Sequence, residues 1–329
     1  MTAGLRALLH QIVDYAGQFP PATLPLDQAI RNYARYHTGA ESWMLGKFIH
    51  IASKLPDLEP YTEELFTAKR PLGVSALGRG GSTSPEFLRG LDADLTAIQS
   101  FHANQGSLAK VEVLETRLPV SVTQTNQGVS LAALFRSINE RVRHHGLNDL
   151  GLFCEVQLTE DFHQQIPEVV TAFREHNEAG RLKFGEEFAF LGFKLRCGGA
   201  DPSAYPSVDQ VAVCLRQCLT NRVAFKATAG LHHPIRHFND SAQTHMHGFL
   251  NVFVSGVLGY VCGLRENDLK PILADEDGDH FCFEDAGVRW GEFHAPIADI
   301  TVARRYSLVS FGSCSFDEPV EDLRELGWL

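Results

Sequence analysis

Short apolar runs of strand length alternate with longer amphipathic stretches along almost the whole chain. The expected strands cover residues 43–51, 72–77, 109–116, 150–158, 188–197, 223–228 and 307–314. Strands that alternate with helices build βαβ units, and repeated βαβ units form a parallel sheet. The sequence therefore predicts an α/β fold and, more specifically, a (β/α)8 barrel of the TIM type. An open, doubly wound sheet is the alternative.

Closure of such a barrel needs eight strands, and only seven strand-like runs are visible. We expect the missing strand between residues 265 and 306. The best candidate there, 280–284, instead pairs with 288–292 as a β-hairpin across the turn Asp285-Ala286-Gly287. The sequence thus predicts a barrel that is either decorated or incomplete.

Length and composition favour a single domain over residues 1–329. The chain is 44% hydrophobic, and α/β barrels routinely run longer than ordinary domains. Residues 2–16 and 26–38 both have helical patterns. We therefore expect residues 1–40 to form an N-terminal helical extension and residues 265–306 to form an insertion.

Charge and cysteine usage exclude several classes of protein. A net charge of −11 disfavours a nucleic-acid partner, whose binding surface is basic. The amphipathic opening segment differs from a signal peptide, and residues 249–264 are too short to span a bilayer. The seven cysteines lie mostly inside apolar segments, which is typical of reduced thiols. These features predict a cytoplasmic protein without membrane contact, and they are compatible with a homo-oligomer.

Four consecutive strands carry polar side chains on one face and apolar side chains on the other. Successive side chains on a strand point to opposite faces, and helices cover the outer face of a parallel barrel. The polar face must then point inward. The residues on it are Glu112, Glu155, Lys194, Arg196, Lys226 and Thr228. Barrel interiors are usually filled by aliphatic side chains, so this cluster predicts an active site, the alternative being a salt-bridged plug without chemistry.

Two of these strands resemble strands of a known enzyme family. Lys226 lies in Phe-Lys-Ala-Thr-Ala-Gly, which resembles the Schiff-base strand of class I aldolases of the deoxyribose-phosphate aldolase type. Lys194-Leu-Arg-Cys-Gly-Gly resembles the second lysine strand of that family. The resemblance covers two strands, in the opposite order along the chain. It implies a lyase that forms a Schiff base on Lys226 and binds phosphate near Gly198 and Gly199.

The residue types agree with this chemistry. A lysine is a nucleophile only when it is neutral, and desolvation and neighbouring cations such as Lys194 and Arg196 favour the neutral form. Glu155 is the expected acid and base. Arg196, Glu112, Thr228, Gly198, Gly199 and Ser313 are the expected substrate-binding residues. The sequence predicts an enzyme that acts on a small anionic carbonyl compound, phosphorylated or carboxylated, without an obligatory cofactor.

A histidine cluster after the sixth expected strand offers a rival interpretation. His232 and His233 follow that strand directly, and three more histidines follow by residue 247. Imidazoles at the C-terminal end of a barrel strand could bind a divalent metal, with Glu112 or Glu155 as a further ligand. The alternative function is then a metal-dependent hydrolase or isomerase. A third alternative is a non-catalytic barrel that binds a small anion.

Overall fold

Eight parallel strands form a closed barrel, which confirms the predicted fold class. The computed structural model describes residues 1–185 and 188–329 of the chain. The strand order around the barrel is β1-β13-β7-β6-β5-β4-β3-β2. The strands are β1 (Val13–Tyr15), β2 (Leu45–Ile51), β3 (Leu72–Leu77), β4 (Ala109–Arg117), β5 (Gly151–Glu155), β6 (Leu191–Arg196), β7 (Phe225–Thr228) and β13 (Leu308–Ser313).

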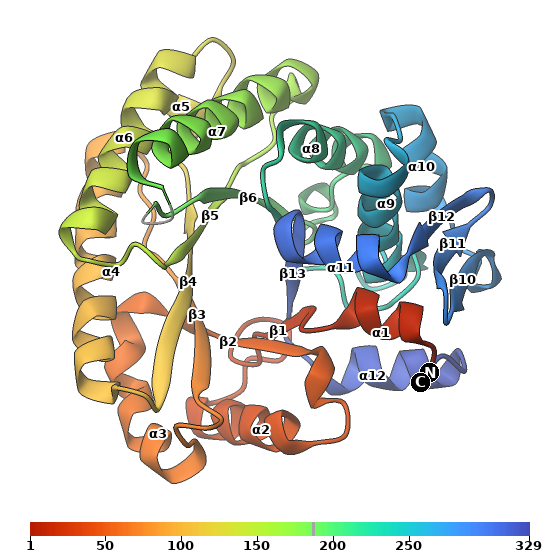
Figure 1. Cartoon of the computed structure of the whole chain (residues 1–329), viewed down its shortest axis with the longest axis horizontal. Coiled ribbons are helices and arrows are strands. Elements are labelled where there is room, and N and C mark those ends of the chain that lie inside the picture. The colour runs from red at the N-terminus through yellow and green to blue at the C-terminus, as the bar shows by residue number, and fades with distance from the viewer. Residues whose placement is uncertain (186–187) are drawn as a thin grey trace. The chain divides into compact units, whose positions relative to one another are not determined.

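Helices alternate with these strands along the chain (Figure 1). They are α1 (Ala3–Leu9), α2 (Leu26–Thr38), α3 (Glu59–Leu65), α4 (Ser84–Gln105), α5 (Val120–Thr123), α6 (Gly128–His144), α7 (Phe162–Phe184), α8 (Val208–Asn221), α9 (Phe249–Cys262), α10 (Glu266–Ala274), α11 (Ile297–Tyr306) and α12 (Asp317–Glu325). Short 3₁₀ helices cover Ser42–Met44, Ala52–Leu58, Pro202–Ala204 and Gly278–His280. A two-stranded sheet pairs β8 (His237–Asn239) with β9 (Thr244–Met246).

The eighth barrel strand is β1, so its expected position between residues 265 and 306 is wrong. β1 has only three residues, and it pairs in parallel with β13. The helix expected over residues 2–16 is correspondingly shorter and ends at Leu9. Residues 1–40 therefore contribute a strand to the barrel and are not purely a helical extension.

The predicted hairpin is present and is extended by a third strand. β10 (Phe281–Glu284) and β11 (Gly287–Trp290) are antiparallel, with Glu284 opposite Gly287 at the turn. β12 (Phe293–Pro296) then pairs with β11. These strands form a separate sheet outside the barrel, so the barrel is decorated and complete.

The chain divides into two compact units, and the division passes through β2 and β6. The first unit contains Met1–Thr23, Tyr36–Gly46 and Leu195–Leu329. The second unit contains Leu24–Arg35 and Lys47–Lys194.

In the second unit α4 packs on β4, and α6 packs on α4 and on α7 (Figure 1). A capping box starts α4: the Thr83 hydroxyl accepts from the Glu86 amide, and the Glu86 carboxylate accepts from the Thr83 amide. This arrangement satisfies amides that have no partner inside the helix. Phe135 of α6 and Phe173 of α7 stack with their ring centroids 4.7 Å apart.

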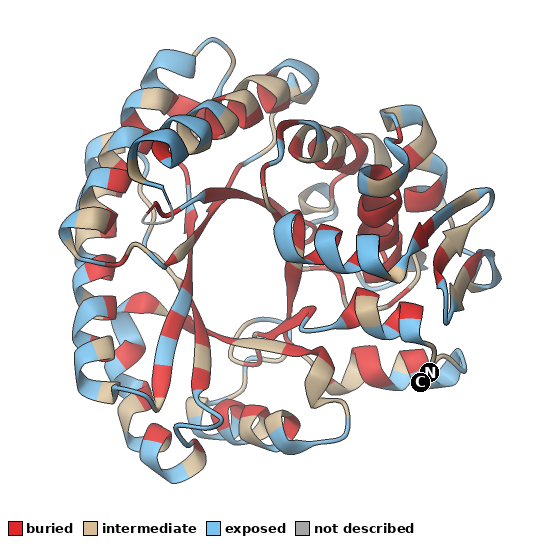
Figure 2. Cartoon of the chain, in the orientation of Figure 1, coloured by how far each residue is buried: buried red, intermediate tan, exposed pale blue. Residues whose placement is uncertain are grey.

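The first unit is built around α9, whose residues are buried over most of its length (Figure 2). Phe249 and Phe253 of α9 pack on Phe311 of β13, with ring centroids 5.1 and 5.9 Å from it. Gly256 gives Leu308 room, since a Cβ there would lie 2.6 Å from the Leu308 side chain. No helix of the described residues is long and apolar enough to cross a membrane.

We expect Phe311→Ala to destabilise the first unit by about 3–5 kcal/mol, because it removes a fully buried ring and leaves a cavity. Urea unfolding followed by circular dichroism measures the effect. Phe238→Ala is the matched control, since that ring is half-exposed and its loss should change stability by less than about 0.5 kcal/mol. Equal effects of the two variants would contradict this account of the core.

Candidate active site

Lys194 of β6 lies between two carboxylates in the second unit. Its Nζ is 2.7 Å from Glu115 Oε2 and 3.2 Å from Glu155 Oε2. Glu155 and Lys194 are direct partners in the pairing of β5 with β6, which places both side chains on the same face. Glu115 comes from β4, so three neighbouring strands contribute one ion each.

Each of the two carboxylates has a second donor. The Ser75 hydroxyl of β3 donates to Glu115 over 2.6 Å. Arg117, the last residue of β4, donates through Nε and Nη2 to Glu155 over 3.1 and 3.0 Å. The positive charges of Lys194 and Arg117 equal in number the negative charges of the two carboxylates. Their mutual attraction offsets much of the free-energy cost of removing these ions from water.

The expectation that Glu112 belongs to the buried charges is wrong, and Glu115 takes this place. The pairing of β3 with β4 shifts where Val74 opposes Val111 and Ser75 opposes Val113, so that Glu112 is an extra residue. Such a bulge displaces the alternation of all later side chains by one position. The Glu112 side chain is 48% exposed, with Lys47 Nζ 3.6 Å away.

Lys226 of β7 forms an ion pair with Asp14 of β1 in the first unit. The Ser310 hydroxyl of β13 donates to the same Asp14 oxygen over 2.7 Å. The side chains of Lys226 and Asp14 are each 1% exposed. Gly46 makes room for this carboxylate, because a Cβ at that position would lie 2.2 Å from Asp14 Oδ1.

Asp14 was missed by the sequence analysis, which assigned its segment to a helix. The available signal for a strand was the alternation in Val13-Asp14-Tyr15, where an acid stands between two apolar residues that are buried. A run of three residues is too short to separate a strand from a helix by periodicity.

His232 and His233 contact carboxylates of α12. His232 Nδ1 lies 3.2 Å from Glu318 Oε2 and 3.8 Å from the Cys314 sulfur. His233 Nδ1 lies 2.7 Å from Asp322 Oδ2. In residues 1–185 and 188–329, no group of three or more His, Cys, Asp or Glu side chains is arranged to hold a metal ion.

Burial lowers the pKa of His232, but the hydrogen bonds with Cys314 and Glu318 outweigh it and raise the pKa to about 9. The same contact with His232 lowers the pKa of Glu318. The contact between His232 and Glu318 therefore favours the protonated imidazole and the ionised carboxylate.

The remaining predicted site residues lie in the first unit. Arg196, the last residue of β6, is exposed, and Thr228, the last residue of β7, is partly exposed. Ser313 is buried at the end of β13, where its hydroxyl accepts from the Ser315 amide over 3.3 Å. Gly198 lies against Gly230, whose Cα would be 2.7 Å from a Cβ at 198, so glycine is needed there for close backbone packing. A Cβ at Gly199 would approach Ala204 to 2.7 Å.

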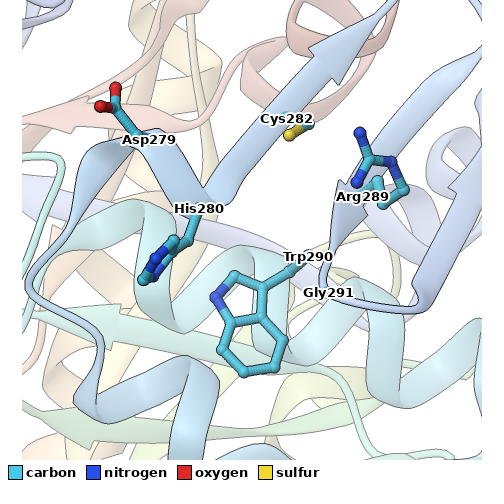
Figure 3. A pocket seen from close by; sticks show the side chains of 6 residues that line it. All are labelled: Asp279, His280, Cys282, Arg289, Trp290 and Gly291. Carbon is cyan, nitrogen blue, oxygen red and sulfur yellow. The ribbon is translucent and has the colours of Figure 1, made fainter.

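A pocket of about 400 Å³ lies in the first unit, at the sheet formed by β10, β11 and β12 (Figure 3). It is lined by Asp279, His280, Cys282, Arg289, Trp290 and Gly291. The indole nitrogen of Trp290 donates to Asp275 over 2.7 Å. None of the predicted site residues lines this pocket.

Comparison with known proteins finds similarity only among solved structures. No family model matches the chain, and no curated protein resembles it in sequence. A deoxyribose phosphate aldolase from Aeropyrum pernix, described as tetrameric, is similar with a TM-score of 0.48 and 11% identity over 98% of this chain and 97% of that chain. A malate synthase from Haloferax volcanii is similar with a TM-score of 0.43 and 10% identity over 97% of this chain and 80% of that chain.

We expect Asp14→Asn and Lys226→Met each to destabilise the protein by about 3–5 kcal/mol, because each leaves its buried partner without a counter-ion. The double variant should lose clearly less than the sum of the two. Urea unfolding of the four proteins gives this double-mutant cycle. Additive losses would show that the two ions do not stabilise each other.

The His232 contact should make stability depend on pH. A pKa raised from 6.5 to about 9 on folding contributes stability in full below pH 6.5, and this contribution is lost as pH rises through 9. The expected size is on the order of 3 kcal/mol. Urea unfolding of the wild type and His232→Gln should therefore differ more at pH 6 than at pH 10. A difference that is constant with pH would contradict the charged state of His232.

Proposed function

We propose that this protein is an enzyme of the lyase class that cleaves or forms a carbon–carbon bond in a small anionic carbonyl compound. The observation that supports the proposal most directly is the position of Lys194 between Glu115 and Glu155. Schiff-base chemistry needs an amine together with a carboxylate that can take up and return protons. The set of Lys194 and its two carboxylates supplies both in one place.

In the proposed reaction, the Lys194 ammonium group first gives a proton to Glu155, 3.2 Å away. The neutral amine then attacks the carbonyl carbon of the substrate. The oxygen leaves as water when it has received two protons, one from the amine and one from Glu155. The product is an iminium ion with a positive charge on nitrogen. This ion accepts the electron pair of the breaking carbon–carbon bond and becomes an enamine, while Glu155, again a carboxylate, takes the hydroxyl proton of the fragment that leaves as a carbonyl compound. Glu155 then gives this proton to the enamine carbon, and water hydrolyses the new iminium ion to release the second product and restore the lysine.

Lys226 remains the second candidate for the nucleophile, as the family resemblance implies. The two lysines differ in access. Lys194 is 7% exposed, and its partner Glu155 contacts the half-exposed Arg117, whereas Lys226 and Asp14 are almost completely enclosed. We therefore favour Lys194. The substrate-binding roles of Arg196, Thr228, Gly198, Gly199 and Ser313, which lie in the same unit as Lys226, stay predictions.

No specific observation favours the metal-dependent alternative. Histidines 232 and 233 pair with carboxylates of α12. Among the residues that the structure describes, they belong to no group of three or more His, Cys, Asp or Glu side chains that could hold a metal ion. A barrel that only binds an anion remains the non-catalytic alternative, and it predicts ligand binding without a covalent intermediate.

Reductive trapping tests the proposal. The protein is treated with borohydride and a panel of aldehydes and keto acids, including acetaldehyde, pyruvate and glyceraldehyde 3-phosphate, and is then digested for mass spectrometry. We expect an adduct on Lys194 and its loss in Lys194→Met. Lys110→Met is the matched control, because Lys110 is a half-exposed surface lysine, and it should leave the adduct unchanged. An adduct on Lys226 would move the nucleophile there, and no adduct on either lysine would refute the Schiff-base reaction.

A further inference from the structure

A glycine-rich turn follows β3 and presents a single long side chain. In Gly78-Arg79-Gly80-Gly81 the backbone runs directly against α4. A Cβ at Gly81 would lie 2.3 Å from the Phe87 amide nitrogen, and a Cβ at Gly78 would lie 2.9 Å from Asp94 Oδ2. The turn is thus packed so closely that Arg79 alone projects from it.

Asp94 of α4 fixes Arg79 at two points. One carboxylate oxygen accepts from the Arg79 amide over 2.8 Å, and the other forms an ion pair with the guanidinium group. Asp94 is only 1% exposed, and burial raises its pKa. Burying the charged Asp94 carboxylate costs free energy, and a neutral hydrogen-bond acceptor would satisfy the Arg79 amide equally well. Only the carboxylate also forms the ion pair that orients the guanidinium group of Arg79, so we infer that this orientation matters.

Arg117 lies beside this turn at the end of β4. Leu77 and Glu115 are partners in the sheet, and the Gly78 amide donates to the Glu115 carbonyl over 2.8 Å. A Cβ at Gly80 would lie 3.4 Å from the Arg117 carbonyl oxygen. The side chains of Arg79 and Arg117 are 42% and 57% exposed. Each guanidinium group is anchored by one carboxylate and keeps further N–H donors on its exposed part.

We propose that Arg79 and Arg117 bind the phosphate group of a phosphorylated substrate, and that Asp94 is the positioning residue for Arg79. This inference rests on the proposed function, since Arg117 also donates to Glu155 beside Lys194. Two guanidinium groups at neighbouring strand ends match a phosphate dianion in charge and in the number of acceptor oxygens. A carboxylate has one charge and two oxygens, so it would use this pair of arginines poorly.

Calorimetric titration of the full chain with inorganic phosphate, at constant ionic strength, tests the site. We expect saturable binding to the wild type and affinities weaker by roughly 10–100-fold in Arg79→Gln and Arg117→Gln, because each loses charge-assisted hydrogen bonds. Arg89→Gln is the matched control: it removes the same charge from an exposed position of α4 and should bind phosphate as the wild type does. Unchanged affinity in Arg79→Gln, or no saturable binding to the wild type, would overturn the proposal.

Two further titrations separate the parts of the inference. Asp94→Asn should weaken phosphate binding while its circular dichroism spectrum remains that of the wild type. Arg79→Lys should also weaken binding, because an ammonium group keeps the charge but lacks the fork of donors. Acetate that binds as tightly as phosphate would overturn the assignment to phosphate. Phosphate binding is measured without a carbonyl compound, and trapping with acetaldehyde is measured without phosphate, so each proposal can fail by itself.

Discussion

The candidate site depends on one constraint, which is that each buried lysine needs a counter-ion of its own. An unpaired ion inside a protein costs several kcal/mol, so each inward-facing charge restricts the residues around it. In the second unit, Glu115 and Glu155 meet this requirement for Lys194. In the first unit, Asp14 meets it for Lys226. Both arrangements are electrically balanced within their own unit. Lys194 and its two carboxylates come from the neighbouring strands β4, β5 and β6, whereas Lys226 and Asp14 come from β7 and β1, which lie on either side of β13.

Most of the fold was predictable because buried strands and amphipathic helices have different periods. Seven barrel strands and the hairpin between β10 and β11 were located from apolar runs and turn residues. β1 was not, since a strand of three residues carries too little pattern. Its place in the barrel is set by pairing with β13, almost three hundred residues away, which a local pattern does not contain.

The two lysines and Glu155 were predictable, whereas Arg117, Glu115 and Asp14 were not. Lys194, Glu155 and Lys226 follow from regular alternation of polar and apolar residues along their own strands. Glu115 does not, because Val111-Glu112-Val113 alternates perfectly and so indicates the wrong glutamate. Only the pairing with β3 reveals the extra residue. Periodicity thus identifies which faces are polar, while the register between strands decides which charges meet.

Lys194 and the three ions of its cluster, Glu115, Glu155 and Arg117, also suit the chemistry because proton exchange among the four groups conserves their total charge. When Lys194 gives a proton to Glu155, both become neutral, and the charges of Arg117 and Glu115 still sum to zero. When a protonated Schiff base forms, the positive charge returns to the same nitrogen, beside the same carboxylates. No step of the proposed reaction then leaves an uncompensated ion in a medium of low dielectric constant, where it would be most costly.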